Sequence, residues 1–145
     1  MGKACQWRTV WSKPRKVAEK GRVMTESPHR HHAIDYIEIP VVDIAAAKEF
    51  YASAFGWAFT DYGSDYAGIQ DSARSGAEVG GLAKTDAVQP GGPLVLLFSD
   101  NLDASVEAVV AAGGLIVSGP YEFPGGRRFH FSDPSGNELG VWAEQ

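Results

Sequence analysis

The sequence predicts an α+β fold, in which two βαβββ modules form one curved mixed sheet around a cleft and the helices lie outside. Three observations predict it. A chain of 145 residues with 44% hydrophobic and 21% charged residues suits a single globular domain. Segments of period-two alternation and segments with helical spacing follow one another between turn residues. The same order occurs twice, and pairing the two units would cover the sheet face that one helix leaves open.

The first strand presents one face for packing and one for the cleft. Period two places Ile37, Ile39 and Val41 on the packing face. Tyr36 and Glu38 then lie on the opposite face. This alternation is typical of a half-buried strand.

The rest of the first module, about 33–88, follows from caps and turns. Asp43 is the expected N-cap of a helix that ends before Gly56. Its apolar stripe recurs every three or four residues and consists of Ala47, Phe50, Tyr51 and Ala54. Three strands should follow, because turn residues separate the segments 57–62, 66–70 and 78–84.

The second module, about 93–145, starts after the chain breaker 89–93. A strand at 94–99 precedes a helix capped by Asp100 or Asn101. The helical stripe consists of Leu102, Val106, Val109 and Val110 and ends at Gly113. The last three strands are expected at 115–118, 127–132 and 138–143.

An internal duplication explains this repetition. Setting Asp43 over Asn101 gives an offset of 58 residues, and the same offset carries Gly56 onto Gly114. Within the second module, the segment 133–137 is interpreted as a turn, because Pro fixes φ and Gly136 permits a positive φ.

Charge is distributed unevenly along the chain. Residues 1–32 carry eight of the thirteen Lys and Arg but two of the eighteen acidic residues, a net charge of +6 that leaves −11 for the remainder. We expect this basic extension to be flexible or to lie against a partner chain. Binding of nucleic acid through the arm is one alternative. Another is upstream sequence read into the chain before a native start at Met24.

Composition argues against several classes of protein. A single cysteine, Cys5, can form neither an internal disulfide nor a multi-cysteine zinc site. No apolar run approaches the roughly eighteen residues that span a bilayer, and no targeting signal is visible. We therefore expect a cytoplasmic protein without a membrane partner.

Two longer segments carry a family resemblance. IEIPVVDIAAAKEFYASAFGW at 37–57 and FSDPSGNELGVW at 131–142, together with the βαβββ repeat, resemble the vicinal oxygen chelate superfamily. This superfamily includes glyoxalase I, bleomycin-resistance proteins and extradiol dioxygenases. The signatures EIPV, FGW, GGL and DPxGNxxGxW are similar to a glyoxalase-like branch related to lactoylglutathione lyase. The resemblance implies a small-molecule cleft. We also expect a homodimer, because small cleft-forming sheets leave edges to cover.

The resemblance also implies four metal-ligating positions, which this sequence does not fill. They correspond to Tyr36, Leu94, Gly140 and a position on the strand 78–84, where Glu78 is the only acidic residue. Leucine and glycine offer no ligand, and a useful divalent site needs three or more protein ligands. We therefore expect no metal and no other cofactor.

Polar residues of the cleft face are candidates for chemistry. Glu38 and His130 are a candidate acid/base pair, since burial and mutual charge can move both pKa values towards neutrality. Arg128 could hold a carboxylate or a phosphate. The alternatives are a structural ion pair between Glu38 and Arg128 and a structural histidine at 130.

Apolar residues complete the expected ligand site. Tyr36, Phe98, Trp142 and also Trp57 could stack on a planar ligand, with Leu94 beside them, or could belong to the core. The segment 121–126 could be a lid over the ligand or a plain turn.

A histidine cluster precedes the first strand. His29, His31 and His32 could bind a transition metal, or belong to a solvated linker.

These observations predict a metal-independent protein that binds an apolar or aromatic small molecule in the cleft of a homodimer. The alternative is a lyase or isomerase in which Glu38 and His130 act as acid and base. A nucleic-acid accessory that uses the basic extension is a third hypothesis.

Overall fold

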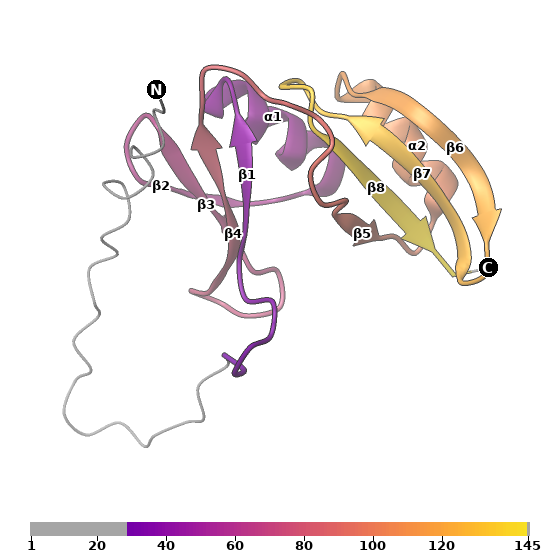
Figure 1. Ribbon diagram of the computed structural model, residues 1–145, viewed down its shortest axis with the longest axis horizontal. Coiled ribbons are helices and arrows are strands. Elements are labelled where there is room, and N and C mark those ends of the chain that lie inside the picture. The colour runs from indigo at the N-terminus through magenta and orange to yellow at the C-terminus, as the bar shows by residue number, and fades with distance from the viewer. Residues whose placement is uncertain (1–28, 145) are drawn as a thin grey trace. The chain divides into compact units, whose positions relative to one another are not determined.

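The computed structural model describes residues 29–144, and the chain divides into two units, Met1–His31 and His32–Gln145. All described helices and strands belong to the second unit (Figure 1). The first module consists of β1 (Ile37–Val41), α1 (Ile44–Phe55), β2 (Phe59–Asp61), β3 (Tyr66–Gln70) and β4 (Glu78–Lys84). The second consists of β5 (Leu96–Phe98), α2 (Leu102–Ala111), β6 (Leu115–Phe123), β7 (Gly126–Ser132) and β8 (Glu138–Ala143). The βαβββ repeat is confirmed.

Each module builds one four-stranded mixed sheet. The strand orders are β1-β4-β3-β2 and β5-β8-β7-β6, with the first strand of each module parallel to its last. The identical topology of the two modules agrees with an internal duplication and confirms the α+β class. The sequence predicted one curved sheet built from both modules. Among the residues that the structure describes, the two sheets are separate and share no strand pairing. In the described chain, β1 and β5 pair only with the last strand of their own module, and β5 has just three residues for a ladder.

Both helices begin and end for reasons visible in the sequence. The Asp43 side chain accepts the Ala46 N–H at 2.9 Å, and Gly56 ends α1 with a left-handed φ of 70°. Asn101, rather than Asp100, caps α2 by accepting the Ala104 N–H at 3.1 Å. Val110 is 55% exposed and is not part of the buried stripe, because it lies about 100° around the helix from buried Val109.

Strand limits differ from the predictions at three places. β2 begins at Phe59, since the Trp57 ring stacks on Tyr51 with centroids 4.6 Å apart instead of continuing a strand. β5 is shorter than 94–99, whereas β6 extends past 118 to Phe123. The segment 121–126 is therefore strand and turn rather than a lid. Tyr121 and Phe123 pair with Arg128 and Gly126 of β7.

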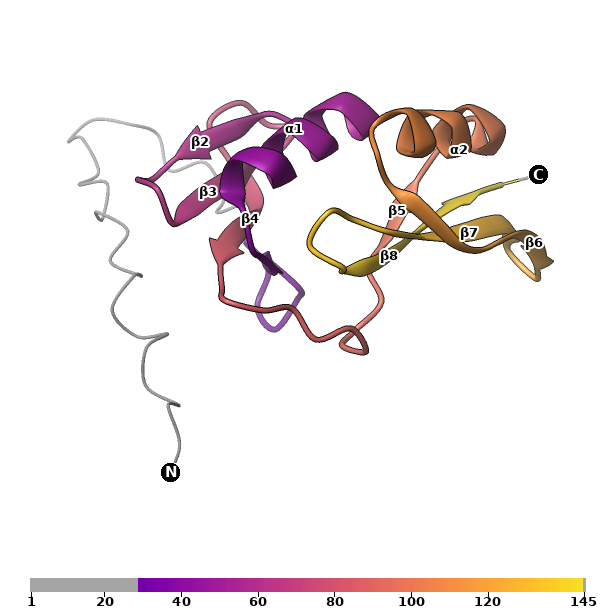
Figure 2. The ribbon, with the colours of Figure 1, turned by 90° about the horizontal axis from the view of Figure 1, so that it is seen from above.

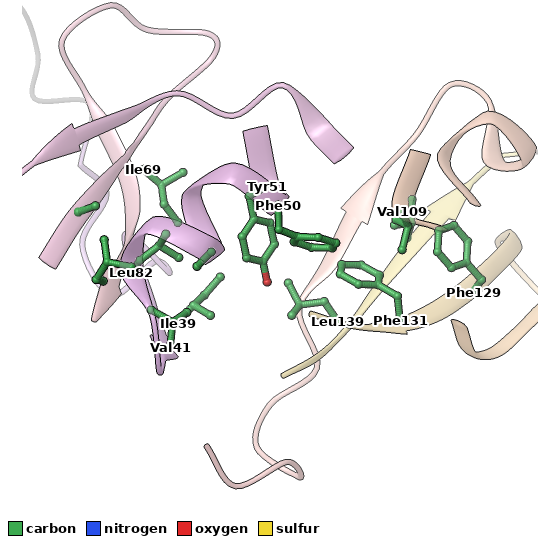
Figure 3. Close-up of a cluster of buried hydrophobic side chains, with 14 of the residues drawn as sticks. Ile39, Val41, Phe50, Tyr51, Ile69, Leu82, Val109, Phe129, Phe131 and Leu139 are labelled. Carbon is green, nitrogen blue, oxygen red and sulfur yellow. The ribbon is translucent and has the colours of Figure 1, made fainter. Parts of the chain in front are cut away.

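The core connects the two modules. Phe50 and Tyr51 of α1 are 2% and 0% exposed and lie between aliphatic residues of the first sheet and Phe131 and Leu139 of the second (Figure 3). The rings of Phe50 and Phe131 are 6.0 Å apart between centroids. The helices α1 and α2 also contact each other (Figure 2). Burial of large aromatic side chains supplies most of the packing free energy of such a core.

A buried carboxylate adds polar ties between the modules. Asp133 is 5% exposed, and its Oδ2 accepts the Tyr51 hydroxyl at 2.8 Å and the Asn137 Nδ2 at 2.9 Å. Asn137 Nδ2 also donates to the Pro40 carbonyl at 2.7 Å, and Ser135 Oγ accepts the Val42 N–H at 3.0 Å. The predicted turn is confirmed by Gly136, whose φ is 92°, and this turn also fastens the second module to β1 and α1.

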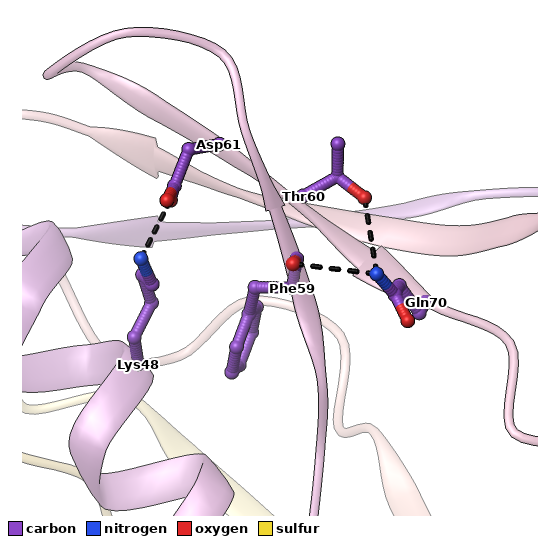
Figure 4. Close-up of polar contacts among 5 residues, drawn as sticks. All are labelled: Lys48, Phe59, Thr60, Asp61 and Gln70. Carbon is purple, nitrogen blue, oxygen red and sulfur yellow. Dashed lines mark hydrogen bonds and ion pairs between the residues drawn. The ribbon is translucent and has the colours of Figure 1, made fainter.

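Polar contacts hold the outer part of the first sheet. Lys48 of α1 pairs with Asp61 of β2 at 2.6 Å (Figure 4). The Gln70 amide donates to the Phe59 carbonyl and to Thr60 Oγ1, each at 3.3 Å. These contacts fix β2 between the helix and β3.

Some sequence predictions concern residues that the structure does not describe. The basic extension 1–32, with Cys5 and Met24, lies outside the described residues except for positions 29–32. In the described part of the chain, no helix is long and apolar enough to cross a membrane.

Candidate functional site

A pocket of about 430 Å³ lies where β1, the inter-module connection and the start of β8 meet. Its walls are mostly apolar, and Glu38, His130 and Glu138 supply its ionisable side chains. The other lining residues are Ile37, Ile39, Pro40, 89–95, Asn137 and Leu139. The sequence-predicted pair Glu38 and His130 and the predicted ligand residue Leu94 thus line one pocket. Such a concave, largely apolar site with few polar groups is typical of small-molecule binding.

Strand alternation places His130 and Arg128 as the sequence predicted. Phe129 and Phe131 are fully buried towards the helices, so Arg128 and His130 lie on the opposite, open face of β7. On β8, Leu139 and Val141 are buried, and Trp142 therefore belongs to the open face. We call this surface of β5–β8 the open face.

His130 is held between two hydrogen-bonding partners. Its Nδ1 lies 3.2 Å from Glu138 Oε1, and its Nε2 lies 3.1 Å from the Tyr121 hydroxyl. Arg128 Nε donates to the same hydroxyl oxygen. Since guanidinium only donates and carboxylate only accepts, the neutral imidazole carries its proton on Nδ1 and accepts the Tyr121 hydrogen at Nε2. The partner of His130 is Glu138, not Glu38.

Arg128 does not form the ion pair with Glu38 that the sequence left open. Its guanidinium carbon lies 5.2 Å from the ring centroids of both Tyr121 and Phe123. Across residues 29–144, the ion pairs do not include Arg128, whereas the adjacent Arg127 lies 3.7 Å from Asp103. Two aromatic rings therefore position the Arg128 cation.

Phe98 and Trp142 meet on the open face. Their ring centroids are 5.1 Å apart at 69°, and Phe98 is 56% exposed. Phe98 also lines an open groove of about 550 Å³, together with Phe55 and Trp57. Trp57 is thus a neighbour of the core and of this groove, and it does not line the pocket at His130.

Tyr36 does not line the pocket and belongs to a polar cluster on the first sheet. Its hydroxyl is 2.6 Å from the Tyr66 hydroxyl, and a Cβ at Gly81 would meet both oxygens. Burial and the hydrogen bond to Tyr66 raise the pKa of the Tyr36 phenol above its ordinary value. Glu78 accepts the Tyr62 hydroxyl at 2.6 Å in the same region.

The donor set does not fit a divalent metal at the positions that the resemblance implies. Leu94 is aliphatic, and the space above Gly140 is filled by Leu96, which a Cβ at residue 140 would strike. Tyr36 is engaged with Tyr66, and Glu78 with Tyr62. Within residues 29–144, no three His, Cys, Asp or Glu side chains form a group that could hold a metal ion, and this includes His29, His31 and His32.

Sequence reasoning missed Tyr121 as a site residue. It was assigned to a loop, yet it bonds both His130 and Arg128. The alternation of Tyr121 and Phe123 before Pro124-Gly125 is a hairpin pattern that could have placed both rings on one strand face. Glu138, at the start of the expected strand 138–143, was not predicted as the partner of His130.

Comparison with known proteins identifies relatives. A "Putative glyoxylase CFP32" of Mycobacterium tuberculosis is 28% identical over 125 residues, covering 80% of this chain and 47% of that protein. The anthracycline biosynthesis protein DauV of Streptomyces sp. (strain C5) is 32% identical over 138 residues, covering 91% and 46% respectively. The chain thus spans about half the length of these curated relatives.

Solved structures show the same fold. TnmS3, an antibiotic binding protein from Streptomyces sp. CB03234, matches with a TM-score of 0.59 and 24% identity, over 83% of this chain and 100% of that one. The family model of the Glyoxalase/Bleomycin resistance protein/Dioxygenase superfamily matches residues 33–141. By this match over most of its length, together with the duplicated βαβββ topology, the chain belongs to that superfamily.

Proposed function

We propose that this glyoxalase-like protein binds an apolar or aromatic small molecule without a metal ion. The observation that carries this proposal is the 430 Å³ pocket, where apolar walls surround Glu38, His130 and Glu138. Leu94 and Gly140 stand at two of the positions where the family resemblance implies metal ligands, and neither side chain can coordinate a metal. An apolar wall supplies affinity through burial, and the few polar groups orient the ligand. TnmS3 is an antibiotic binding protein, and DauV belongs to anthracycline biosynthesis, which supports a flat polycyclic ligand class.

A neutral three-ring probe tests this proposal. Isothermal titration of the chelator-treated full chain with anthraquinone-2-carboxamide should show saturable binding that added zinc or nickel does not strengthen. Leu94→Trp, which fills the pocket, should weaken binding by at least about tenfold, because it removes the space the rings occupy. Leu115→Trp is the matched control, since Leu115 lies on β6, does not line the pocket and is 70% exposed. Equal binding by the two variants, or binding only with added metal, would contradict the proposal.

Lyase or isomerase chemistry is a second candidate, because Glu38 and His130 line the same pocket. In this mechanism Glu38 and His130 exchange a proton with the substrate. Tyr121 donates to His130 Nε2 and would have to release that nitrogen before it could exchange a proton with the substrate. Glu138 would stabilise the protonated imidazole from Nδ1.

Lactoylglutathione formation by the full chain tests this candidate. Glu38→Gln and His130→Gln should each lower the rate by roughly a hundredfold or more. Full turnover by both variants would remove the acid/base assignment. It would leave the binding function untouched.

A further inference from the structure

A single row of side chains crosses the whole second sheet on its open face. The residues are cross-strand neighbours in register: Phe98 pairs with Trp142, Trp142 with Arg128, and Arg128 with Tyr121. Directly opposed residues on one face lie side by side, so the row is continuous from β5 to β6. We call these four residues the aromatic row. It contains three rings and one cation.

The rings of the row are packed at their edges and partly open to solvent. Trp142 is flanked by Phe98 at 5.1 Å and by Phe123 at 6.2 Å, both in edge-on contacts at 69° and 75°. Phe98 remains 56% exposed although it is large and apolar. A rigid aromatic surface of this kind binds flat rings at low conformational cost.

Arg128 lies in the row, and only some of its N–H donors have a hydrogen-bond partner. Its Nε is bonded to Tyr121, and its guanidinium lies against the rings of Tyr121 and Phe123. In the described chain, its two terminal nitrogens have neither a hydrogen bond nor an ion pair. A guanidinium fixed at Nε presents these terminal donors as a preformed fork, whose geometry matches a carboxylate.

Two acidic side chains near Arg128, Glu138 and Glu122, do not pair with it in the described chain. Glu138 is bonded to His130, and Glu122 alternates to the other face of β6, in register with Arg127. The residues after position 32 carry a net charge of −11, which repels a dianion more than a monoanion. These charges favour a singly charged carboxylate over a phosphate.

The row adjoins the pocket described above. His130 lines the pocket and is two residues from Arg128 on the same face of β7, and Tyr121 bonds to both. Leu94, also in the pocket, precedes Leu96 and Phe98 of β5 along the same face. A flat molecule that enters the pocket can therefore extend along the open face to the row.

We propose that the ligand is a flat polycyclic aromatic carboxylic acid, whose rings extend from the pocket along the open face to Phe98 and Trp142 and whose carboxylate is held by the terminal nitrogens of Arg128. This inference rests on the proposed function and narrows its ligand class. Arg128 selects for the charge, and the rings of the row select for a planar shape.

The test compares two probes of equal shape. Isothermal titration of the full chain uses anthraquinone-2-carboxylate and its neutral amide, anthraquinone-2-carboxamide. The wild-type protein should bind the acid at least about tenfold tighter, as a charge-assisted bidentate contact allows. Arg128→Gln should reduce this preference to within about twofold. Arg127→Gln, which removes a neighbouring cation paired with Asp103, should keep it.

The outcomes separate this inference from the proposed function. Equal affinity of wild-type protein for acid and amide, or a preference that survives Arg128→Gln, would overturn the inference while binding itself stands. No binding of either probe would overturn both. If Arg128→Gln does not fold, the salt dependence of binding to the wild-type protein provides the test. Rising NaCl should weaken binding of the acid and leave binding of the amide unchanged. An acid preference that is independent of salt would overturn the inference.

Discussion

At the scale of single residues, Asp133 shows how one carboxylate stabilises the fold. Its two oxygens accept four hydrogen bonds, from the Ser135 and Asn137 backbone, the Asn137 amide and the Tyr51 hydroxyl. Burial, and then the neighbouring Asp133 charge, raise the pKa of the Tyr51 phenol above its usual value. The hydrogen bond from Tyr51 to Asp133 therefore forms only while the Tyr51 phenol is protonated.

Replacing Tyr51 tests this contact and its pH dependence. Tyr51→Phe should lower the free energy of unfolding by about 1 to 3 kcal/mol near neutral pH, because the buried Asp133 charge loses a donor. Since the folded pKa is raised, this contribution is complete below the unfolded pKa of 10.0 and decreases as pH rises above it. Urea unfolding between pH 7 and 11 should show the gap between variant and wild type narrowing above pH 10. A constant gap would contradict the assignment.

His130 provides a second residue-scale prediction. The bonds to Glu138 and Tyr121 require the neutral ring to carry its proton on Nδ1. Nitrogen-15 NMR of imidazole-labelled protein should show this tautomer for the neutral His130 ring. Tyr121→Phe should shift the population towards the Nε2–H form, because Nε2 loses its donor. An Nε2–H tautomer in the wild-type protein would show that the hydrogen-bond directions are wrong.

At the scale of elements, the predicted strand limits were right where local turn residues bound the strand and wrong where contacts with another strand or helix set the limit. β3, β4 and β8 have the predicted limits, because turn residues bound each of them on both sides. β6 was predicted too short, since Gly119-Pro120 reads locally as a turn although pairing with β7 continues past it. The residues around Trp57 have the composition of a strand, but the Trp57 ring stacks on Tyr51 of α1. A contact between two elements cannot be seen in the local sequence pattern.

The helix caps give an element-scale prediction. Asp43→Ala and Asn101→Ala should each lower the free energy of unfolding by about 0.5 to 2 kcal/mol, since each removes the side-chain acceptor of a helix N-terminus. Asp100→Ala is the control for the second helix, because Asn101 and not Asp100 is its cap. Thermal unfolding followed by circular dichroism measures all three. A larger effect at Asp100 than at Asn101 would contradict the cap assignment.

At the scale of the whole molecule, the turn 133–137 couples the two modules. Asn137 donates from one amide nitrogen to Pro40 of β1 and to Asp133. Asn137→Ala should lower stability by about 1 to 3 kcal/mol, as expected when buried polar groups lose a partner. Hydrogen exchange should show increased opening in β1 as well as in β8, since the contact crosses between the modules. Opening confined to the second module would contradict this coupling.

The sequence predicts the site only in part. Alternation along 127–132 was enough to orient Arg128 and His130, and these residues lie on the open face as predicted. Their partners could not be predicted, because Glu138 and Tyr121 come from other strands and depend on register. Tyr36 lies in a separate cluster with Tyr66, since the glycine at 81 leaves room for two phenols above β4.

Metal-independent binding in the pocket is the central claim, and one NMR experiment tests it directly. Anthraquinone-2-carboxylate is titrated into chelator-treated, isotope-labelled full chain, and backbone shifts are mapped. The account predicts shifts at β1, at Leu94 and His130 of the pocket, and along the open face, with little change in α1 and α2. Shifts that appear only after zinc or nickel is added, or that spare the pocket, would contradict it.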